Sequence, residues 1–214
     1  MYRPAHFEEN RSEVLHAMMQ AHPLAQLVTH GADGLDANPL PFELDTAAGP
    51  HGTLRAHVAR ANPVWQQADG TEVLVIFQAA QGYISPNWYP SKPEHHRHVP
   101  TWNYAVVHAH GRLHVMDDER FVRGLVARLT REHEQRSQQP RPWRMGDSAP
   151  DFIDGMLQAI VGVEVEITRL VGKFKLGQNR EARDREGAAA GLDGLGQHDL
   201  AEAMRSAAVP KQGN

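Results

Sequence analysis

The sequence predicts an α+β protein in which an antiparallel β-barrel carries peripheral helices. The segments occur in the order helix, several short strands, helices and a late strand, unlike the strict alternation that builds a parallel sheet. The residues GADG at 31–34 form a tight turn of the hairpin type between two strands. Pro39 and Pro41 place the second strand at an edge or barrel rim, because proline cannot donate to a β-ladder.

The first half of the chain is expected to begin with a helix and to continue with strands. Apolar residues recur at helical spacing within 9–21, and Pro23 ends this helix because the residue before a proline avoids helical geometry. A short helix is expected to begin at Asn62-Pro63, where proline suits the first turn. Strands are expected at 24–30, 35–44, 52–59 and 72–79, the last of them central and buried.

The second half combines two longer helices with two strands. Strands are expected at 106–116 and 160–177, and helices at 118–136 and 151–159. The tail after Arg180 is rich in Ala, Gly and charged residues, with one short helix near 198–208. The predicted organisation is one domain over 1–180 with helices inserted at about 118–159, followed by a polar helical tail over 181–214.

Composition excludes several classes of protein. With 41% hydrophobic and 22% charged residues, the 214-residue chain is typical of a globular protein. The absence of cysteine excludes disulfides, thiolate metal sites and a cysteine nucleophile, and it fits a reducing compartment. The polar N-terminus has no apolar signal core, and no apolar run is long enough to span a membrane. We therefore expect a cytoplasmic protein that makes no membrane contact.

Histidines suggest a metal or a haem as alternative ligands. Imidazoles two residues apart in a strand point to the same face, and three of them would suit zinc or non-haem iron. A haem could use one of them as an axial ligand, but the chain has no haem-attachment motif. An exposed histidine-rich face explains the same pattern, and no carboxylate stands beside it, so no metal ligand is predicted. The histidines concerned are His95, His96, His98, His108, His110 and His114.

Binding to DNA is a further alternative. Segment 120–144 holds seven arginines against two glutamates, a local excess of 7 − 2 = +5, and segment 169–185 has an excess of 6 − 2 = +4. Such segments can neutralise phosphates. However, a long proline-containing loop separates the helices at 118–136 and 151–159, whereas a helix-turn-helix needs a short turn. DNA binding therefore stays open without a recognisable motif, and a solvated basic face explains 120–144 equally well.

The segment KFKLGQNR at 173–180 gathers hydrogen-bond donors at the end of a strand. Two lysines alternate around Phe174, and Gln178, Asn179 and Arg180 follow a turn at Gly177. Donors with few acceptors suit an anionic or amide-rich ligand such as a flavin, whose ring edge and phosphate accept hydrogen bonds. A polar loop that caps the barrel is the alternative interpretation.

Several motifs in one order carry a family resemblance. Together they resemble the PaiB family, the FMN-binding negative transcriptional regulators, over nearly the whole chain from its start to Arg180. Many relatives carry serine where this chain has Gly177, and the donors around it are kept. The motifs are NPLPFEL (38–44), HVARANPVW (57–65), VLVIFQ (73–78), YISPNWY (83–89), VPTWNYAVVHAHG (99–111), IVGVEVEI (160–167) and KFKLGQNR (173–180).

The resemblance implies an FMN-binding split barrel over 1–180, similar to pyridoxamine-phosphate oxidases and flavin reductases. It also implies a homodimer with FMN at the subunit interface. Carried over by position, the site would comprise Leu40, whose backbone meets the flavin ring; His57, Arg60 and Asn62, near the phosphate and ribityl chain; Gln78, close to the ring; Trp102, from the partner chain; and Lys175, Gln178, Asn179 and Arg180, which close the site.

Function follows from the same resemblance. The protein is expected to be a PaiB-type FMN-binding protein and a negative transcriptional regulator. The first alternative is a flavin-dependent oxidoreductase, either a flavin reductase or an oxidase, and the second is a haem- or metal-binding barrel. No residue is assigned as catalytic, although His57 and His108 are candidates for a general acid or base.

Overall fold

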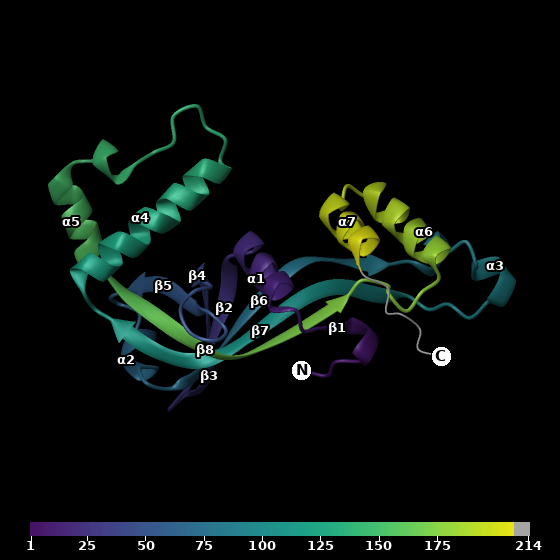
Figure 1. Cartoon of the computed structure of the whole chain (residues 1–214), viewed down its shortest axis with the longest axis horizontal. Helices are drawn as coiled ribbons and strands as arrows, with labels where there is room; N and C mark the ends of the chain where they lie inside the picture. The colour runs from purple at the N-terminus through teal and green to yellow at the C-terminus, as the bar shows by residue number, and fades with distance from the viewer. Residues whose placement is uncertain (208–214) are drawn as a thin grey trace. The chain divides into compact units, whose positions relative to one another are not determined.

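A computed structural model describes residues 1–207, apart from the side chain of His95 (Figure 1). The helices are η1 (Ala5–Phe7), α1 (Ser12–Ala21), α2 (Val64–Gln67), η2 (Pro86–Trp88), α3 (Lys92–His95), α4 (Glu119–Arg136), η3 (Met145–Asp147), α5 (Pro150–Gln158), α6 (Ala182–Asp193) and α7 (His198–Ser206). The strands are β1 (Glu8–Glu9), β2 (Leu24–Gly31), β3 (Gly34–Pro41), β4 (Glu43–Asp45), β5 (Thr53–Ala59), β6 (Glu72–Ile84), β7 (Thr101–Met116) and β8 (Ile160–Lys175).

The strands form one sheet in the order β3-β2-β6-β7-β8-β5-β4, with β1 added to β8. The pairs β2–β3, β2–β6, β4–β5 and β5–β8 are all antiparallel. Strand β3, which carries the two prolines, pairs with β2 at the end of this order, as predicted for an edge strand. Its other side lies against β5, so the sheet curls into a barrel. The predicted α+β class with an antiparallel split barrel and peripheral helices is therefore confirmed.

The chain divides into two compact units, which are described separately. The barrel unit comprises His16–Phe77 and His108–Leu170. The terminal unit comprises Met1–Leu15, Gln78–Val107 and Val171–Asn214, described as far as residue 207. Strands β6, β7 and β8 each contribute residues to both units. The predicted domain boundary at Arg180 stays a prediction.

The barrel unit has an apolar interior built by strand alternation. Along β2, buried and accessible residues alternate, so that Ala25, Leu27 and Thr29 point to one face. Helix α4 begins at Asp118, whose carboxylate accepts a hydrogen bond from the Phe121 amide at 2.8 Å. Its apolar face buries Leu125, and α5 lies beside it (Figure 1).

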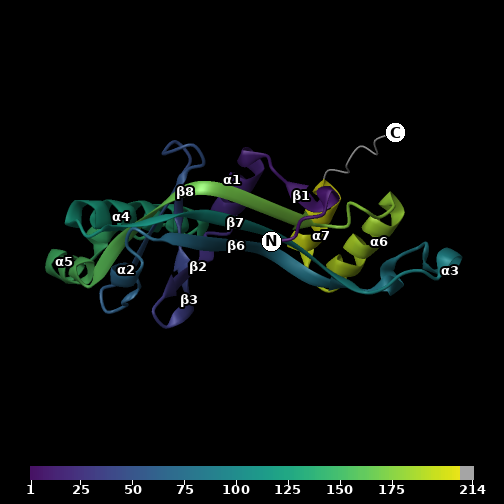
Figure 2. The ribbon, with the colours of Figure 1, turned by 90° about the horizontal axis from the view of Figure 1, so that it is seen from below.

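Helices α6 and α7 build the core of the terminal unit (Figure 2). Buried Ala188, Ala189 and Leu192 on α6 join residues of α7 in one apolar cluster. A Cβ added at Gly191 would lie 2.3 Å from the Trp88 ring, so glycine allows the close approach. Helix α6 lies within the predicted helical tail over 181–214 but received no bounds of its own, because small residues give little hydrophobic periodicity. Helix α7 confirms the helix predicted near 198–208, whose last residue lies outside the described residues.

Two of the long strands extend beyond their predicted ends. Strand β6 reaches Ile84 and β7 starts at Thr101, so Tyr83 and Trp102 lie on strands. The alternation of buried and accessible residues continues along β7, which explains why the aromatic stretch stays extended. None of the helices within residues 1–207 is both long and apolar enough to cross a membrane.

Candidate functional site

The ten residues implied by the resemblance fall into both units. Four of them belong to the barrel unit, where Leu40 lies on β3 opposite Ala25. Asn62 connects this edge to the start of α2, because its amide nitrogen donates to Asn38 at 2.7 Å and its carbonyl accepts from the Val64 amide at 3.0 Å. The structure therefore holds the proline-bearing strand and the HVARANP segment together through side-chain hydrogen bonds.

Arg60 makes four side-chain hydrogen bonds to partners in its own unit. Its two terminal nitrogens bind the Asp117 carboxylate at 2.9 and 2.7 Å, a bidentate geometry. Its Nε donates to the carbonyl of Gln158 at 2.8 Å, and Nη2 also reaches the carbonyl of Ile160 at 3.1 Å. The guanidinium thus ties the end of β5 to the start of β8. A place near the FMN phosphate stays a prediction for this residue.

His57 lines a cleft between the barrel and helix α4. The cleft has a volume of about 400 Å³, and its walls include Pro41, His57, Leu129, Thr130, His133 and Trp143. The Nδ1 atom of His57 is buried and has no hydrogen-bond partner. Burial lowers the pKa of His57, so the imidazole is held neutral. A neutral imidazole with an unused nitrogen can donate to or accept from a bound molecule, depending on its tautomer.

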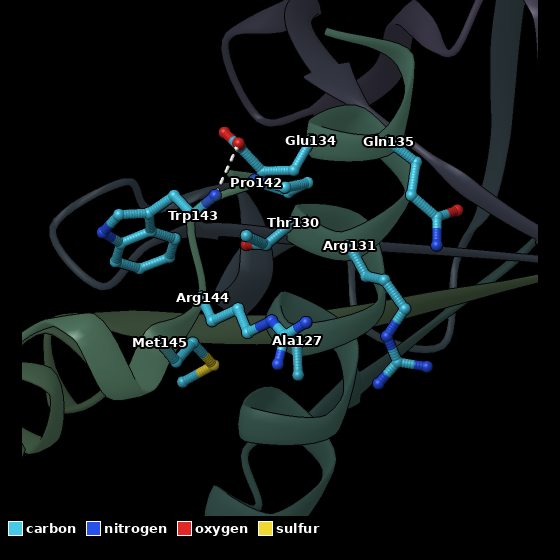
Figure 3. A pocket seen from close by; sticks show the side chains of 9 residues that line it. All are labelled: Ala127, Thr130, Arg131, Glu134, Gln135, Pro142, Trp143, Arg144 and Met145. Atoms are coloured by element: carbon cyan, nitrogen blue, oxygen red, sulfur yellow. Dashed lines mark hydrogen bonds between the residues drawn. The ribbon is translucent and has the colours of Figure 1, made fainter. Parts of the chain in front are cut away.

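A second pocket adjoins this cleft along a neighbouring face of α4. The residues of α4 form one wall and the segment 142–145 forms the other (Figure 3). Its volume is about 390 Å³, and it shares Thr130, Glu134 and Trp143 with the His57 cleft. The Glu134 carboxylate accepts a hydrogen bond from the Trp143 amide at 2.9 Å, which fixes the loop against the helix (Figure 3). Sequence reasoning did not select Trp143, because it stands in a loop without a recognisable motif.

In the terminal unit, Gln78 and Trp102 are exposed. The Trp102 side chain is 55% exposed, and its ring meets that of Tyr83 edge to face at a centroid distance of 6.3 Å. An exposed tryptophan on a strand offers a large apolar area to a bound molecule or a partner chain. This position is compatible with the role implied for Trp102 by the resemblance.

The segment 173–180 contributes a lysine that points back to its own sheet. The Lys175 ammonium donates to the Thr101 hydroxyl and to the Trp102 carbonyl. Burial, together with the positive charges of Lys173 and Arg180, lowers the pKa of Lys175. The group is therefore crowded by cations, and an anion would relieve the crowding.

Gln178 serves the local turn. Its side-chain oxygen accepts from the Leu176 amide at 2.8 Å, while its nitrogen donates to the Phe174 carbonyl at 2.6 Å. Gly177, between Leu176 and Gln178, has a φ of 84°, a left-handed conformation that glycine adopts without strain. Glycine at this position therefore fits the turn.

A buried network fixes Arg180. Ser91 donates from Oγ to Asp184 at 2.6 Å, so its oxygen accepts from Nε2 of His98 at 2.8 Å. The Nδ1 atom of His98 is then the acceptor for Arg180, 3.4 Å away. The guanidinium also lies over the ring of Tyr89, with its central carbon 5.2 Å from the centroid. Burial opposes ionisation, but hydrogen bonds from Ser91 keep the pKa of Asp184 below its usual value.

Tyr89 and Arg180 line a small pocket in the terminal unit. It has a volume of about 160 Å³ and is lined in part by Tyr89, Asn103, Lys175, Asn179, Arg180 and Arg185. The Nη1 atom of Arg185 is buried without a hydrogen-bond partner. Sequence reasoning did not select Arg185, because it lies in α6, which was read as part of a polar tail.

The histidines of β7 do not assemble a metal centre in the described part of the chain. The rings of His108 and His110 are neighbours, with centroids 6.3 Å apart. Burial, with Arg169 nearby, lowers the pKa of both imidazoles. Among the described residues no three His, Cys, Asp or Glu side chains lie close enough to hold a metal ion. The side chain of His95 lies outside the described residues.

Comparison with known proteins assigns the family. A family model described as "Putative FMN-binding domain" matches residues 1–169. The chain belongs to this family. The Bacillus subtilis protein named "Protease synthase and sporulation protein PAI 2" is 29% identical, with 86% of this chain and 85% of the relative covered. An uncharacterised protein of Aspergillus fumigatus is 31% identical over 92% of each chain. The predicted membership in the PaiB family is confirmed, as is FMN as the cofactor of the family.

The fold of this FMN-binding family also occurs in distant solved structures. The FAD and haem binding protein of Mycobacterium smegmatis aligns with a TM-score of 0.55 and 17% identity, over 79% of this chain and 74% of that one. At this identity the similarity shows the fold alone.

The residues present fit an FMN molecule in their chemistry. FMN combines an apolar ring that carries hydrogen-bonding edges with an anionic phosphate. The barrel unit offers an apolar cleft with the unused Nδ1 of His57, and the terminal unit offers a cationic pocket with the unused Nη1 of Arg185. Two buried nitrogens that lack a protein partner are costly unless water or a ligand supplies a hydrogen bond, and a flavin nucleotide carries groups that can do so.

Proposed function

We propose that the protein is a PaiB-type flavoprotein that binds FMN and acts as a flavin-dependent oxidoreductase. The observation that best supports the binding of a flavin is the pair of buried nitrogens without partners, His57 Nδ1 and Arg185 Nη1. Leaving a polar group buried and unpaired costs about 1–3 kcal/mol, so such atoms are rare in folded chains. A hydrogen-bonding group of a flavin nucleotide bound at the barrel unit would give His57 Nδ1 a partner, and one bound at the terminal unit would give Arg185 Nη1 a partner.

The side chains of the site would orient FMN through hydrogen bonds and charge. Bound FMN supplies the electron-transfer chemistry. His57, kept neutral by its burial, would hold one edge of the flavin through a single hydrogen bond. Lys175, Gln178, Asn179 and Arg180 would close the site, with Gln178 fixing the turn that presents its neighbours. Leu40 and Asn62 would add contacts from the barrel unit, where Arg60 stiffens the end of β5, and Gln78 would add an amide contact from the terminal unit.

We propose that the negative regulation of transcription implied by the resemblance does not require direct reading of DNA. The basic helix α4 uses its arginines within the barrel unit: Arg123 lies 2.6 Å from Asp154, and Arg128 lies 2.6 Å from Glu43. These ion pairs neutralise part of the positive segment, which weakens its attraction for DNA phosphates. Regulation would then follow from the flavin state or from a partner protein.

A mobility-shift titration over a series of salt concentrations tests this indirect route. Indirect regulation predicts weak binding that disappears at moderate salt and prefers no genomic fragment. Retention of one fragment in salt, with loss on Arg131→Gln, would show a specific contact instead.

We propose that the protein is a cytoplasmic homodimer with FMN at the subunit interface. The exposed ring of Trp102, beside the half-exposed Tyr83, supports an interface on this strand face. Light scattering coupled to gel filtration measures the assembly directly. We expect a dimer for the wild type and dissociation for Trp102→Ala, whereas an equally stable dimer in this variant would remove Trp102 from the interface.

The visible spectrum of the purified protein, recorded before and after FMN is added, tests the proposed function. Flavin absorption bands with quenched fluorescence are expected. Reduction of the bound flavin by a nicotinamide nucleotide would identify that nucleotide as the electron donor of the oxidoreductase. A sharp haem band, or no retention of FMN, would contradict the proposal. Arg180→Ala should weaken FMN binding more than Arg128→Ala, because Arg128 is held by Glu43.

A further inference from the structure

Cationic side chains without acidic partners surround the small pocket of the terminal unit. Lys175, Arg180 and Arg185 all line it, and none of the described residues in its wall is acidic. Asp184 is the nearby carboxylate, and both of its oxygens accept hydrogen bonds from Ser91. The positive charge in the pocket is therefore not compensated by the residues that line it.

Arg185 provides the clearest sign of a missing partner. Its Nη1 atom is buried and makes no hydrogen bond, although a guanidinium has five N–H donors. Other arginines of the same unit find carboxylates: the neighbouring Arg183 binds Glu94 through two contacts of 2.6 Å each. A buried guanidinium nitrogen without a hydrogen-bond partner is costly, and an anion in the pocket that Arg185 lines would provide a charged acceptor.

The pocket is preorganised. His98 accepts from Arg180 and passes a hydrogen bond to Ser91, which in turn donates to Asp184. This chain and the ring of Tyr89 fix the guanidinium of Arg180 without consuming all of its donors. Because the donors are held in place before a ligand arrives, little ordering entropy is lost when one binds.

The size of the pocket restricts the ligand to a small group. About 160 Å³ corresponds to roughly five water molecules at their share of liquid volume. A phosphate group, with five non-hydrogen atoms, fits this space, whereas complete small-molecule sites usually measure about 300–1,000 Å³. Arginine is well suited to phosphate because its fork of donors matches two phosphate oxygens.

We propose that the pocket formed by Lys175, Arg180 and Arg185 binds a phosphate group, with Arg185 as a binding residue and His98, Ser91 and Asp184 as positioning residues. The phosphate is either that of FMN or that of another molecule, such as inorganic phosphate or a nicotinamide nucleotide. Only the assignment to FMN rests on the proposed function.

Inorganic phosphate is the first probe. Thermal unfolding of the full chain is followed in increasing phosphate, with chloride at matched ionic strength as the reference. Stabilisation that depends on phosphate is expected, because a ligand that binds the folded state alone raises its stability. Arg185→Gln should weaken phosphate binding about tenfold or more, the usual effect of losing a charge-assisted hydrogen bond.

Two further variants keep the test independent of folding. Arg183→Gln removes a neighbouring exposed arginine that binds Glu94, and it should leave the phosphate response unchanged. Arg185→Lys keeps the charge and should bind phosphate with an affinity between those of the wild type and Arg185→Gln. The inference is overturned if the wild type responds equally to phosphate and chloride, or if a folded Arg185→Gln protein binds phosphate like the wild type.

Flavin titrations then identify the source of the phosphate. If FMN binds at least about tenfold more tightly than riboflavin and inorganic phosphate competes with it, the pocket holds the FMN phosphate. If FMN and riboflavin bind equally while phosphate still stabilises the protein, the pocket serves another phosphate. Failure to bind either flavin, with phosphate binding intact, would contradict the proposed function and leave this inference standing.

Discussion

Arg60 and Arg185 look alike in the sequence but stand in opposite electrostatic situations. Arg60 in the barrel unit binds the Asp117 carboxylate with two hydrogen bonds and two backbone carbonyls as well. Arg185 in the terminal unit buries a nitrogen without any partner and shares a pocket with Lys175 and Arg180. An arginine or lysine side chain therefore indicates an anion-binding site only when no carboxylate of the same chain pairs with it.

The largest expected loss of stability comes from removing Asp184 of the terminal unit, compared with Asp117 of the barrel unit. Asp184 is 2% exposed, and Asp184→Ala would leave two buried donors of Ser91 without an acceptor. The free energy of unfolding should fall by about 3 kcal/mol. Asp117→Ala breaks an exposed pair and should leave the stability close to that of the wild type. Denaturant titration checks both, and equal losses would remove the contrast in burial on which the comparison depends.

Two helix glycines, one in each unit, differ in the space around them. A Cβ at Gly187 would lie 2.2 Å from the backbone oxygen of Trp88, so Gly187→Ala must displace α6, which carries Arg185. We expect a loss of about 2 kcal/mol together with a weaker phosphate response. Gly155 in α5 of the barrel unit meets no atom within 4 Å, and Gly155→Ala should stabilise by about 0.5 kcal/mol. Thermal unfolding that ranks these variants in the reverse order would contradict the packing of α6.

The pH dependence of stability tests the second unpaired nitrogen. Burial puts the folded-state pKa of His57 below the ordinary value of 6.5, so the folded state binds fewer protons than the unfolded chain near that pH. The stability from this group is present above about pH 6.5 and is lost as the pH falls through 6.5 toward the lower folded pKa, at a slope of at most about 1.4 kcal/mol per pH unit.

His57→Gln should therefore flatten the fall in melting temperature between neutral and mildly acidic pH. His108, whose pKa burial also lowers, keeps part of that slope. His30→Gln, at an exposed position near the end of β2, is the control. An unchanged slope in His57→Gln would mean that His57 is not buried in a neutral form, and the cleft would lose its candidate polar contact.

The smallest expected effect concerns the helix starts of the two regions. The Asp118 carboxylate caps α4, so Asp118→Ala should cost about 1 kcal/mol. Glu181 precedes α6 and makes no side-chain capping bond, and Glu181→Ala should change the stability by less than about 0.5 kcal/mol. Urea titrations of the two variants decide the matter. A larger loss at Glu181 would indicate an additional role for this residue near the phosphate pocket.

Much of the fold could be predicted because the barrel strands carry local signals. The tight turn at 31–34 and the prolines of β3 led to the correct hairpin and to the correct edge. The bounds of helix α6 escaped prediction, because its buried Ala188 and Ala189 are too small to mark an apolar face and its glycines serve a contact with Trp88. Tertiary packing, which the local sequence does not encode, decides such a helix.

The candidate site shows the same limit. The hydrogen-bond donors of segment 173–180 could be predicted from its residue types, and Lys175, Asn179 and Arg180 line one pocket. The engagement of Arg60 could not be foreseen, since its partner Asp117 lies 57 residues away. Arg185 could not be predicted either, because the local sequence does not show whether the fold brings a carboxylate to an arginine in a charged segment.

The most direct test of the account compares the affinity ratio of FMN to riboflavin in Arg60→Gln and Arg185→Gln. Fluorescence quenching measures both flavins in each variant and in the wild type. We predict that Arg185→Gln lowers the preference for FMN by about tenfold or more and that Arg60→Gln lowers it less, because the Arg60 donors are already occupied. A preference that collapses in Arg60→Gln and survives in Arg185→Gln would place the flavin phosphate in the barrel unit and contradict the account.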